Sequence, residues 1–153
     1  MAPTGGYVSE DGHSFACVNP TVSIAAYHVI FLIDRSASMR NKDQRPIPNT
    51  PVYNSICAVA NNRLGAVYSA LFGFWTARAA AIQASGSNTP RRDSYSVALC
   101  NNTSQVVLEN DFSRSPQELL RALLPHRPCG GNDFSQNMRA GLDLMEKHWR
   151  NDQ

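Results

Sequence analysis

The strongest hydrophobic signal in the chain is a short apolar run near its start. Residues 27–33 are almost all β-branched, aliphatic or aromatic, and the run ends abruptly at Asp34. A strand with one exposed face would alternate apolar and polar residues, so a continuous run predicts a strand covered on both faces inside an α/β sheet. Residues 1–25 are rich in Gly, Ser, Thr and Pro without periodicity, which predicts a flexible N-terminal arm.

A long amphipathic helix is predicted next. Apolar residues recur at steps of three and four between about positions 62 and 83, which is the period of a helix with one buried face. Three prolines between positions 46 and 51 disfavour a long element ahead of it, and we expect this loop to border a ligand-binding face. The predicted buried stripe consists of Leu64, Val67, Tyr68, Leu71, Phe72, Trp75, Ala79 and Ile82.

Two further strands form a predicted hairpin. Residues 95–100 and 105–109 are rich in β-branched and aliphatic side chains, and a short turn around Asn101-Asn102 separates them. A connection this short predicts antiparallel pairing of the two strands.

Two helices complete the predicted order. Ser115, Pro116 and Glu118 stand where an N-cap, a first helical residue and a capping-box acid belong, so a helix begins there and ends near Pro125. The last helix has its apolar residues on one face, which we expect to pack in the core; these residues are Met138, Leu142, Met145 and Trp149.

The order strand, helix, strand, strand, helix, helix predicts an α/β fold. The 153 residues suffice for one domain, and a hydrophobic fraction of 42% can fill its core. The formal charge is only +2 and the basic residues are scattered, which argues against nucleic-acid binding. Without a signal peptide or a bilayer-length apolar run, we expect a cytoplasmic protein with no membrane contact. Four cysteines with no C-x-x-C pair predict reduced thiols and no zinc site.

A candidate metal site follows the first strand directly. Asp34, Ser36 and Ser38 offer one carboxylate and two hydroxyl oxygens within a single turn. In open α/β sheets, ligands bind at the carboxyl ends of the strands, where this turn belongs. Hard oxygen ligands with little negative charge suit Mg²⁺ or Mn²⁺, and a cation held in this way can take a further carboxylate from a partner molecule.

Two motifs, in this order, give the chain a resemblance to a known family. Residues 28–39, His-Val-Ile-Phe-Leu-Ile-Asp-Arg-Ser-Ala-Ser-Met, resemble the first strand and metal-ion-dependent adhesion site (MIDAS) of von Willebrand factor type A domains. Residues 130–135, Gly-Gly-Asn-Asp-Phe-Ser, resemble that family's second metal loop. The long helix, the hairpin and the last helix follow the family's order, so the resemblance covers about residues 26–148.

The resemblance implies a Rossmann-like sheet flanked by helices, with the first strand central and Mg²⁺ or Mn²⁺ at its carboxyl edge. It implies a protein-binding module without enzyme activity, which depends on the divalent metal and whose partner is a protein that supplies an acidic side chain. Asp34, Ser36 and Ser38 match the family's metal residues directly. Asn132 stands where the family has a threonine ligand, and Asp133 beside it offers a carboxylate in its place.

The family also has an acidic residue after a fourth apolar strand, and the sequence ends at Gln153, where that strand would begin. We therefore interpret residues 26–153 as a partial von Willebrand factor A domain, truncated after the third helix. The first strand is then expected to have an uncovered apolar edge, which is open to self-association.

Two other interpretations start from the same residues. Haloacid dehalogenase-like phosphotransferases also have an aspartate after the first strand, but they need a second acid two residues later, where Ser36 stands. The other alternative is a degenerate scaffold domain without metal function, which the departure at Asn132 and the missing acid favour. The four histidines are spread along the chain and fit packing better than catalysis.

Overall fold

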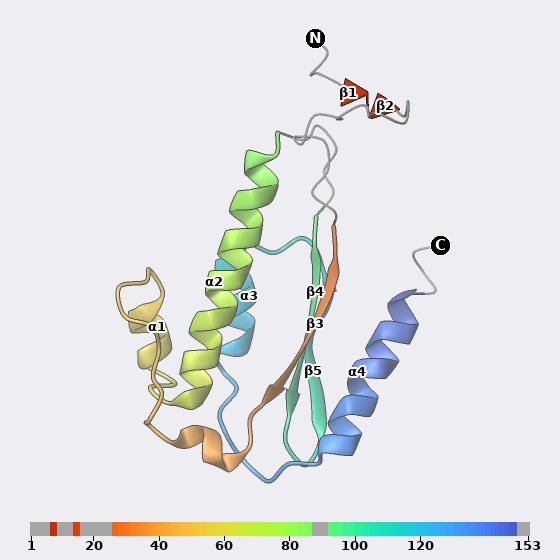
Figure 1. Cartoon of the computed structure of the whole chain (residues 1–153). Coiled ribbons are helices and arrows are strands. Elements are labelled where there is room, and N and C mark those ends of the chain that lie inside the picture. Colours follow the sequence, from red (N-terminus) through yellow and green to blue (C-terminus); the bar gives the residue numbers. More distant parts are fainter. Residues whose placement is uncertain (1–6, 9–13, 16–25, 87–91, 150–153) are drawn as a thin grey trace.

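The computed structural model describes residues 7–8, 14–15, 26–86 and 92–149 of the chain. In this part the chain has a mixed α/β fold with a three-stranded mixed sheet and four α-helices (Figure 1). The elements are β1 (Tyr7–Val8), β2 (Ser14–Phe15), β3 (His28–Asp34), the 3₁₀ helix η1 (Ala37–Arg40), α1 (Tyr53–Cys57), α2 (Arg63–Ala84), β4 (Ser94–Cys100), β5 (Ser104–Asp111), α3 (Pro116–Leu123) and α4 (Phe134–Trp149).

The first 25 residues enter this description only through β1 and β2, which pair with each other in antiparallel fashion. The prediction of a flexible arm over residues 1–25 otherwise lies outside the described residues. The same holds for most of the loop that the sequence predicts after the long helix, because residues 87–91 are not described.

The main sheet has the strand order β3-β4-β5. β3 runs parallel to β4, with His28 beside Ser94 at one end and Asp34 beside Cys100 at the other. β4 and β5 are antiparallel, with Cys100 opposite Ser104 next to the turn, so the predicted hairpin is confirmed. Figure 1 shows α1, α2 and α3 on one face of this sheet and α4 on the other.

The apolar run of residues 27–33 does form a strand, but it is less buried than predicted. Of the residues in β3 only Ile33 is buried, and the others are half-buried. In β4, by contrast, six of the seven residues are buried. The reason is position in the sheet: β4 is central, whereas β3 is an edge strand that has β4 as its single strand partner among the described residues. Among the described strands, the first strand therefore lies at an edge of the sheet, and not at its centre as the resemblance implied.

The long helix α2 supplies much of the core. Asn62 caps it, because the Asn62 side-chain oxygen accepts a hydrogen bond from the Gly65 N–H at 3.1 Å. The predicted stripe is buried or half-buried as far as Trp75, but beyond it Ala79 is exposed and Ile82 is half-buried. Figure 1 shows α3 beside the first half of α2 alone, which explains why full burial stops midway.

The capping signals around α3 are confirmed. The Ser115 hydroxyl accepts from the Glu118 N–H at 3.2 Å, and the Glu118 carboxylate accepts from the Ser115 N–H at 3.1 Å. This reciprocal pair is the predicted capping box, and Pro116 opens the helix as expected. α3 then buries its leucines at positions 119, 120 and 123 in the same core as α2.

The prediction for the last helix is wrong in one respect. α4 exists over the expected residues, but its apolar face is exposed to solvent. The buried side of α4 consists of Asn137, Gly141 and Leu144. Gly141 lies against Leu32, since a Cβ at that glycine would be 2.8 Å from a Leu32 methyl carbon. The exposed residues and their exposed fractions are Met138 51%, Leu142 46%, Met145 54% and Trp149 71%.

The physical reason is that a polar side chain fixes the orientation of α4. The Asn137 amide donates to the backbone oxygen of Asn101 at 3.2 Å, and its oxygen accepts from the Ser104 hydroxyl at 2.6 Å. The hydrogen bonds of Asn137 hold α4 at the β4–β5 turn, and Gly141 lets the helix lie close to Leu32 of β3. The face of α4 that packs on the sheet is therefore not the one that its apolar periodicity predicts.

Two glycines of α2 offer a matched test of this packing. A Cβ at Gly65 would lie 1.7 Å from the backbone oxygen of Ala60, whereas a Cβ at Gly73 meets nothing within 4 Å. We expect Gly65→Ala to lower the free energy of unfolding by about 1–3 kcal/mol, because a backbone group must move. Gly73→Ala should raise it by about 0.5–1 kcal/mol, since alanine is the better helix former. Urea unfolding followed by circular dichroism measures both; equal effects of the two substitutions would contradict the packing described.

Candidate metal centre

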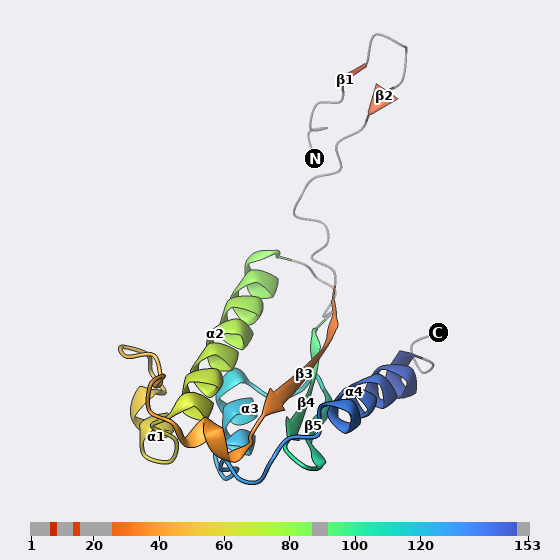
Figure 2. The same ribbon diagram turned by 60° about the horizontal axis from the view of Figure 1, so that its bottom comes forward.

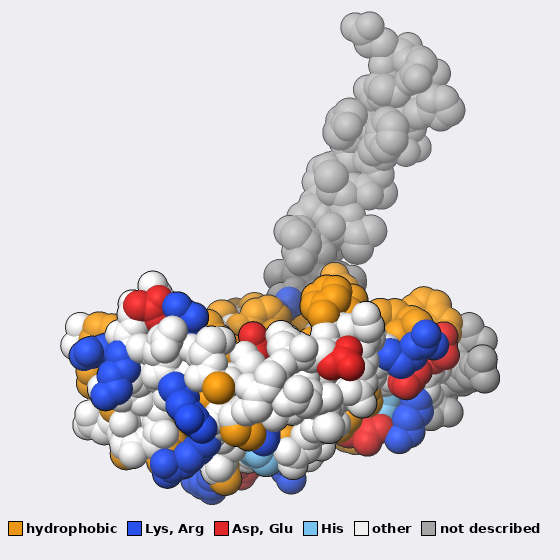
Figure 3. Space-filling view, turned by 90° about the horizontal axis from the view of Figure 1, so that it is seen from below, with side chains coloured by type: hydrophobic (Ala, Val, Ile, Leu, Met, Phe, Trp, Pro, Cys, Tyr) orange, Lys and Arg blue, Asp and Glu red, His pale blue; other side chains and the backbone are white. Residues whose placement is uncertain are grey.

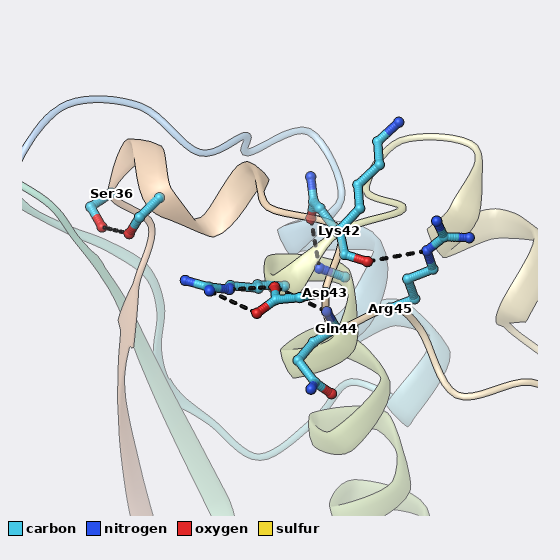
Figure 4. Close-up of polar contacts among 9 residues, drawn as sticks. Ser36, Lys42, Asp43, Gln44 and Arg45 are labelled. Carbon is cyan, nitrogen blue, oxygen red and sulfur yellow. Dashed lines mark hydrogen bonds and ion pairs between the residues drawn. The ribbon is translucent and has the colours of Figure 1, made fainter.

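The candidate site begins where β3 ends. The parallel ladder continues for one bond past Asp34, because the Arg35 N–H donates to the backbone oxygen of Cys100 at 2.8 Å. The chain then turns into η1, and one Asp34 carboxylate oxygen accepts from the Ser36 N–H at 2.7 Å. The Ser36 and Ser38 hydroxyl oxygens lie 3.2 Å apart at the start of η1 (Figure 4). The structure therefore brings Asp34, Ser36 and Ser38 together in one turn.

The spacing of the two hydroxyls fits a small divalent cation. Neighbouring ligands in an octahedron with Mg–O distances of about 2.0–2.1 Å are about 3 Å apart, which is close to the 3.2 Å between Ser36 Oγ and Ser38 Oγ. Ser36 is buried and Asp34 half-buried, whereas Ser38 is exposed. A cation held here would have protein on one side and open solvent on the other.

The second predicted metal loop lies directly beside the first. The Ala37 N–H donates to the Gly130 oxygen at 2.9 Å, and the Cys129 N–H donates to the Arg35 oxygen at 2.8 Å. Two segments that are more than ninety residues apart in sequence thus share backbone hydrogen bonds. The structure brings the two motifs together as neighbouring loops at one end of the sheet.

The side chains of the second loop have other partners. The Asn132 oxygen accepts from the Asn137 amide at 3.0 Å, and an Asp133 carboxylate oxygen accepts from the Gln136 N–H at 3.0 Å. Asp133 thereby caps the first turn of α4. Both side chains are exposed, and the contacts described for them lead to α4, not to Asp34. Their predicted role as metal ligands stays a prediction.

Sequence reasoning missed two residues that hold the second loop in place. Asn101 donates from its amide to the Cys129 backbone oxygen at 3.0 Å, and the Asn102 side-chain oxygen accepts from the Gly131 N–H at 2.7 Å. Gly130 has a φ of +75°, and a Cβ there would lie 2.7 Å from that Asn102 oxygen. The pair Asn101-Asn102 looked like an ordinary turn signal, and its positioning role required knowledge of which loop lies opposite.

A basic and sulfur-containing cluster supports the same two loops. The Arg35 guanidinium donates to the Cys129 thiol at 3.2 Å and to the Gln105 side-chain oxygen at 3.2 Å. Cys129 is half-exposed, and the hydrogen bond from Arg35 lowers the pKa of its thiol below the ordinary value. Cys57, Cys100 and Cys129 are free thiols, and Cys17 lies outside the described residues.

Cys129 should therefore be more reactive than Cys100. Because Arg35 stabilises the Cys129 thiolate, its alkylation should reach half-maximal rate at a lower pH than that of Cys100, whose pKa burial raises. Arg35→Met should move the Cys129 midpoint to higher pH. The rate of iodoacetamide labelling, measured across pH by mass spectrometry, tests this prediction. If the pH dependence of Cys129 labelling is the same in Arg35→Met as in the unmodified chain, Arg35 does not stabilise the Cys129 thiolate.

The site is not strongly acidic. Among residues 26–86 and 92–149 there is no group of three or more His, Cys, Asp or Glu side chains that could hold a metal ion. The nearby Asp43, in the loop after η1, forms an ion pair at 2.6 Å with the guanidinium of Arg63 at the start of α2 (Figure 4). Seen from this end of the molecule, the surface is mostly polar, and hydrophobic side chains gather along its upper margin (Figure 3). A cation here would depend on hydroxyl and amide oxygens.

Comparisons with known proteins bear on the fold alone. No protein-family model and no curated protein sequence matches the chain. A crystal structure of an uncharacterized membrane-spanning protein from Vibrio fischeri is similar, with a TM-score of 0.56, 11% identity and coverage of 81% of this chain. The chain spans about half of that protein, 51%. In the described part of our chain, no helix combines the length and the apolar character needed to cross a membrane.

Proposed function

We propose that this chain is a divalent-metal-dependent protein-binding module of the von Willebrand factor A type, with a Rossmann-like sheet and no catalytic activity. The observation that carries the proposal is the turn after β3. It gathers one carboxylate and two hydroxyls, with the hydroxyl oxygens 3.2 Å apart, at the carboxyl end of a parallel strand. The similarity to a solved structure supports the fold but adds nothing about activity.

The chemistry of the site suggests what kind of partner it takes. A cation with a single carboxylate ligand keeps most of its positive charge, so a further carboxylate gains strongly from binding to it. Ser38 is exposed, which leaves the outer side of the turn open to another molecule. We therefore propose Mg²⁺ or Mn²⁺ as the cation and a protein that supplies an acidic side chain as the partner.

Metal-induced stabilisation tests the proposal. A cation that binds only the folded chain should raise the free energy of unfolding by about 2.7 kcal/mol when its concentration is a hundred times its dissociation constant. Asp34→Ala should abolish this gain. Asp43→Ala is the matched control, because it removes a nearby carboxylate that is already paired with Arg63 and should retain the gain. The measurement is the melting temperature with increasing Mg²⁺ or Mn²⁺.

A specific observation favours one competing function. Asn132 and Asp133 hydrogen-bond to the first turn of α4, which is what a scaffold without metal function would need from them. If the intact chain gains no stability from either cation, or Asp34→Ala gains as much as the unmodified chain, that metal-free interaction scaffold replaces the proposed function.

A further inference from the structure

The backbone of Ala37 lies between the two hydroxyls of the metal turn and takes its hydrogen-bond partner from outside η1. The first N–H of a helix has no carbonyl within the helix to accept from it, and the Ser36 side chain does not cap η1. The Ala37 N–H instead donates to the Gly130 backbone oxygen at 2.9 Å. The Gly130 carbonyl therefore holds the Ala37 backbone, and with it the Ser36 and Ser38 residues on either side.

Asn102 holds the same peptide group from the opposite side. The Gly130 oxygen and the Gly131 N–H belong to one peptide group, and in a planar trans peptide these two atoms point in opposite directions. The Gly131 N–H donates to the Asn102 side-chain oxygen at 2.7 Å. Asn102, the Gly130–Gly131 peptide group and the Ala37 N–H thus form one continuous chain of hydrogen bonds. Figure 2 shows the segment ahead of α4 passing between η1 and the β4–β5 turn, where these residues meet.

The Gly130–Gly131 peptide group has little intrinsic restraint on its orientation. Gly130 has a φ of +75°, in the left-handed region, and neither glycine has a Cβ that would oppose rotation of the peptide plane between them. A half-turn of this plane would direct the Gly130 oxygen away from Ala37. The Asn102 side-chain oxygen opposes that rotation, because it holds the N–H at the other edge of the plane.

Packing in the core does not account for Asn102. This residue is exposed, whereas its neighbour Asn101 is buried and anchors the start of the same loop through the Cys129 oxygen at 3.0 Å. A substitution at an exposed position removes little buried surface, so its main effect at Asn102 is the loss of the bond to Gly131.

We propose that Asn102 is a positioning residue for the candidate metal turn. Through the Gly130–Gly131 peptide group it holds the Ala37 N–H. It thereby keeps the Ser36 and Ser38 hydroxyl oxygens at the 3.2 Å spacing that suits a small divalent cation. The part that Asn102 has in metal binding rests on the proposed function, but its part in ordering the turn does not.

Amide exchange in the full chain, with a chelator present, tests the ordering of the turn in the absence of metal. In Asn102→Ala the Ala37 amide should exchange about fivefold faster than in the unmodified chain, because the carbonyl that accepts from it is no longer held. Asn102→Asp keeps a side-chain oxygen for the Gly131 N–H and should restore the slow exchange. The Leu99 amide, in the buried strand β4, reports general loss of stability and should change much less.

Thr103→Ala is the matched control. Thr103 lies in the same turn, is exposed and uncharged, and donates its hydroxyl to the Asn101 side-chain oxygen at 3.3 Å. The substitution removes this side chain but leaves the bond between Asn102 and Gly131 in place. The Ala37 amide of Thr103→Ala should therefore exchange as in the unmodified chain.

Titration with Mn²⁺, followed by the electron paramagnetic resonance signal of the free ion, tests the consequence for metal binding. Asn102→Ala should raise the dissociation constant of Mn²⁺ about two- to fivefold, because the apparent affinity falls with the fraction of molecules whose turn is ordered. Thr103→Ala should leave the constant unchanged. Asn102→Asp has no place in this titration, since its charge would itself attract the cation.

Three results would overturn the proposal. The first is Ala37 exchange that is equally fast in Asn102→Ala and the unmodified chain, or that Thr103→Ala accelerates as much. The second is an Asn102→Asp chain that exchanges as fast as Asn102→Ala. The third is a Mn²⁺ dissociation constant that Asn102→Ala does not change. A chain that binds no Mn²⁺ at all would overturn the proposed function instead, and the Ala37 exchange would still decide whether Asn102 orders the turn.

Discussion

The parallel pairing of β3 with β4 is the constraint on which the candidate site depends. It aligns Asp34 with Cys100, and so the turn that follows β3 lies level with the turn that follows β4. Asn101 and Asn102 then meet the loop at Gly130, which in turn bonds to Ala37. A slip of the pairing by one residue would turn every β3 side chain to the other face and move Asp34 out of this arrangement.

Signals that act over a few residues were readable from the sequence. The capping box of α3 and the β4–β5 hairpin each depend on neighbours within a few positions. The turn containing Asp34 and Ser36 was found for the same reason, since its oxygens lie within one turn of chain. Such local features can be predicted without knowing which elements pack against them.

Features set by distant partners were not readable. The orientation of α4 depends on Asn137 reaching Ser104 and on Gly141 meeting Leu32, and neither contact follows from helical periodicity. An apolar stripe predicts burial only when another element is available to cover it. The roles of Asn101 and Asn102 were hidden in the same way, because their partners come from a loop about thirty residues later.

β3 positions the candidate metal turn, because this turn follows directly from its carboxyl end. At this turn the Ser36 and Ser38 hydroxyl oxygens lie 3.2 Å apart.

The central claim is that a divalent cation binds at the carboxyl end of β3. Adding a small amount of Mn²⁺ to the ¹⁵N-labelled chain tests it most directly, because the paramagnetic ion broadens nearby amide signals with a steep dependence on distance. The account predicts that the Ser36 and Ser38 signals disappear first, while those of His28 and Ser94, roughly 20 Å away along the strands, stay sharp. Broadening centred elsewhere, or no selective broadening at all, would contradict it.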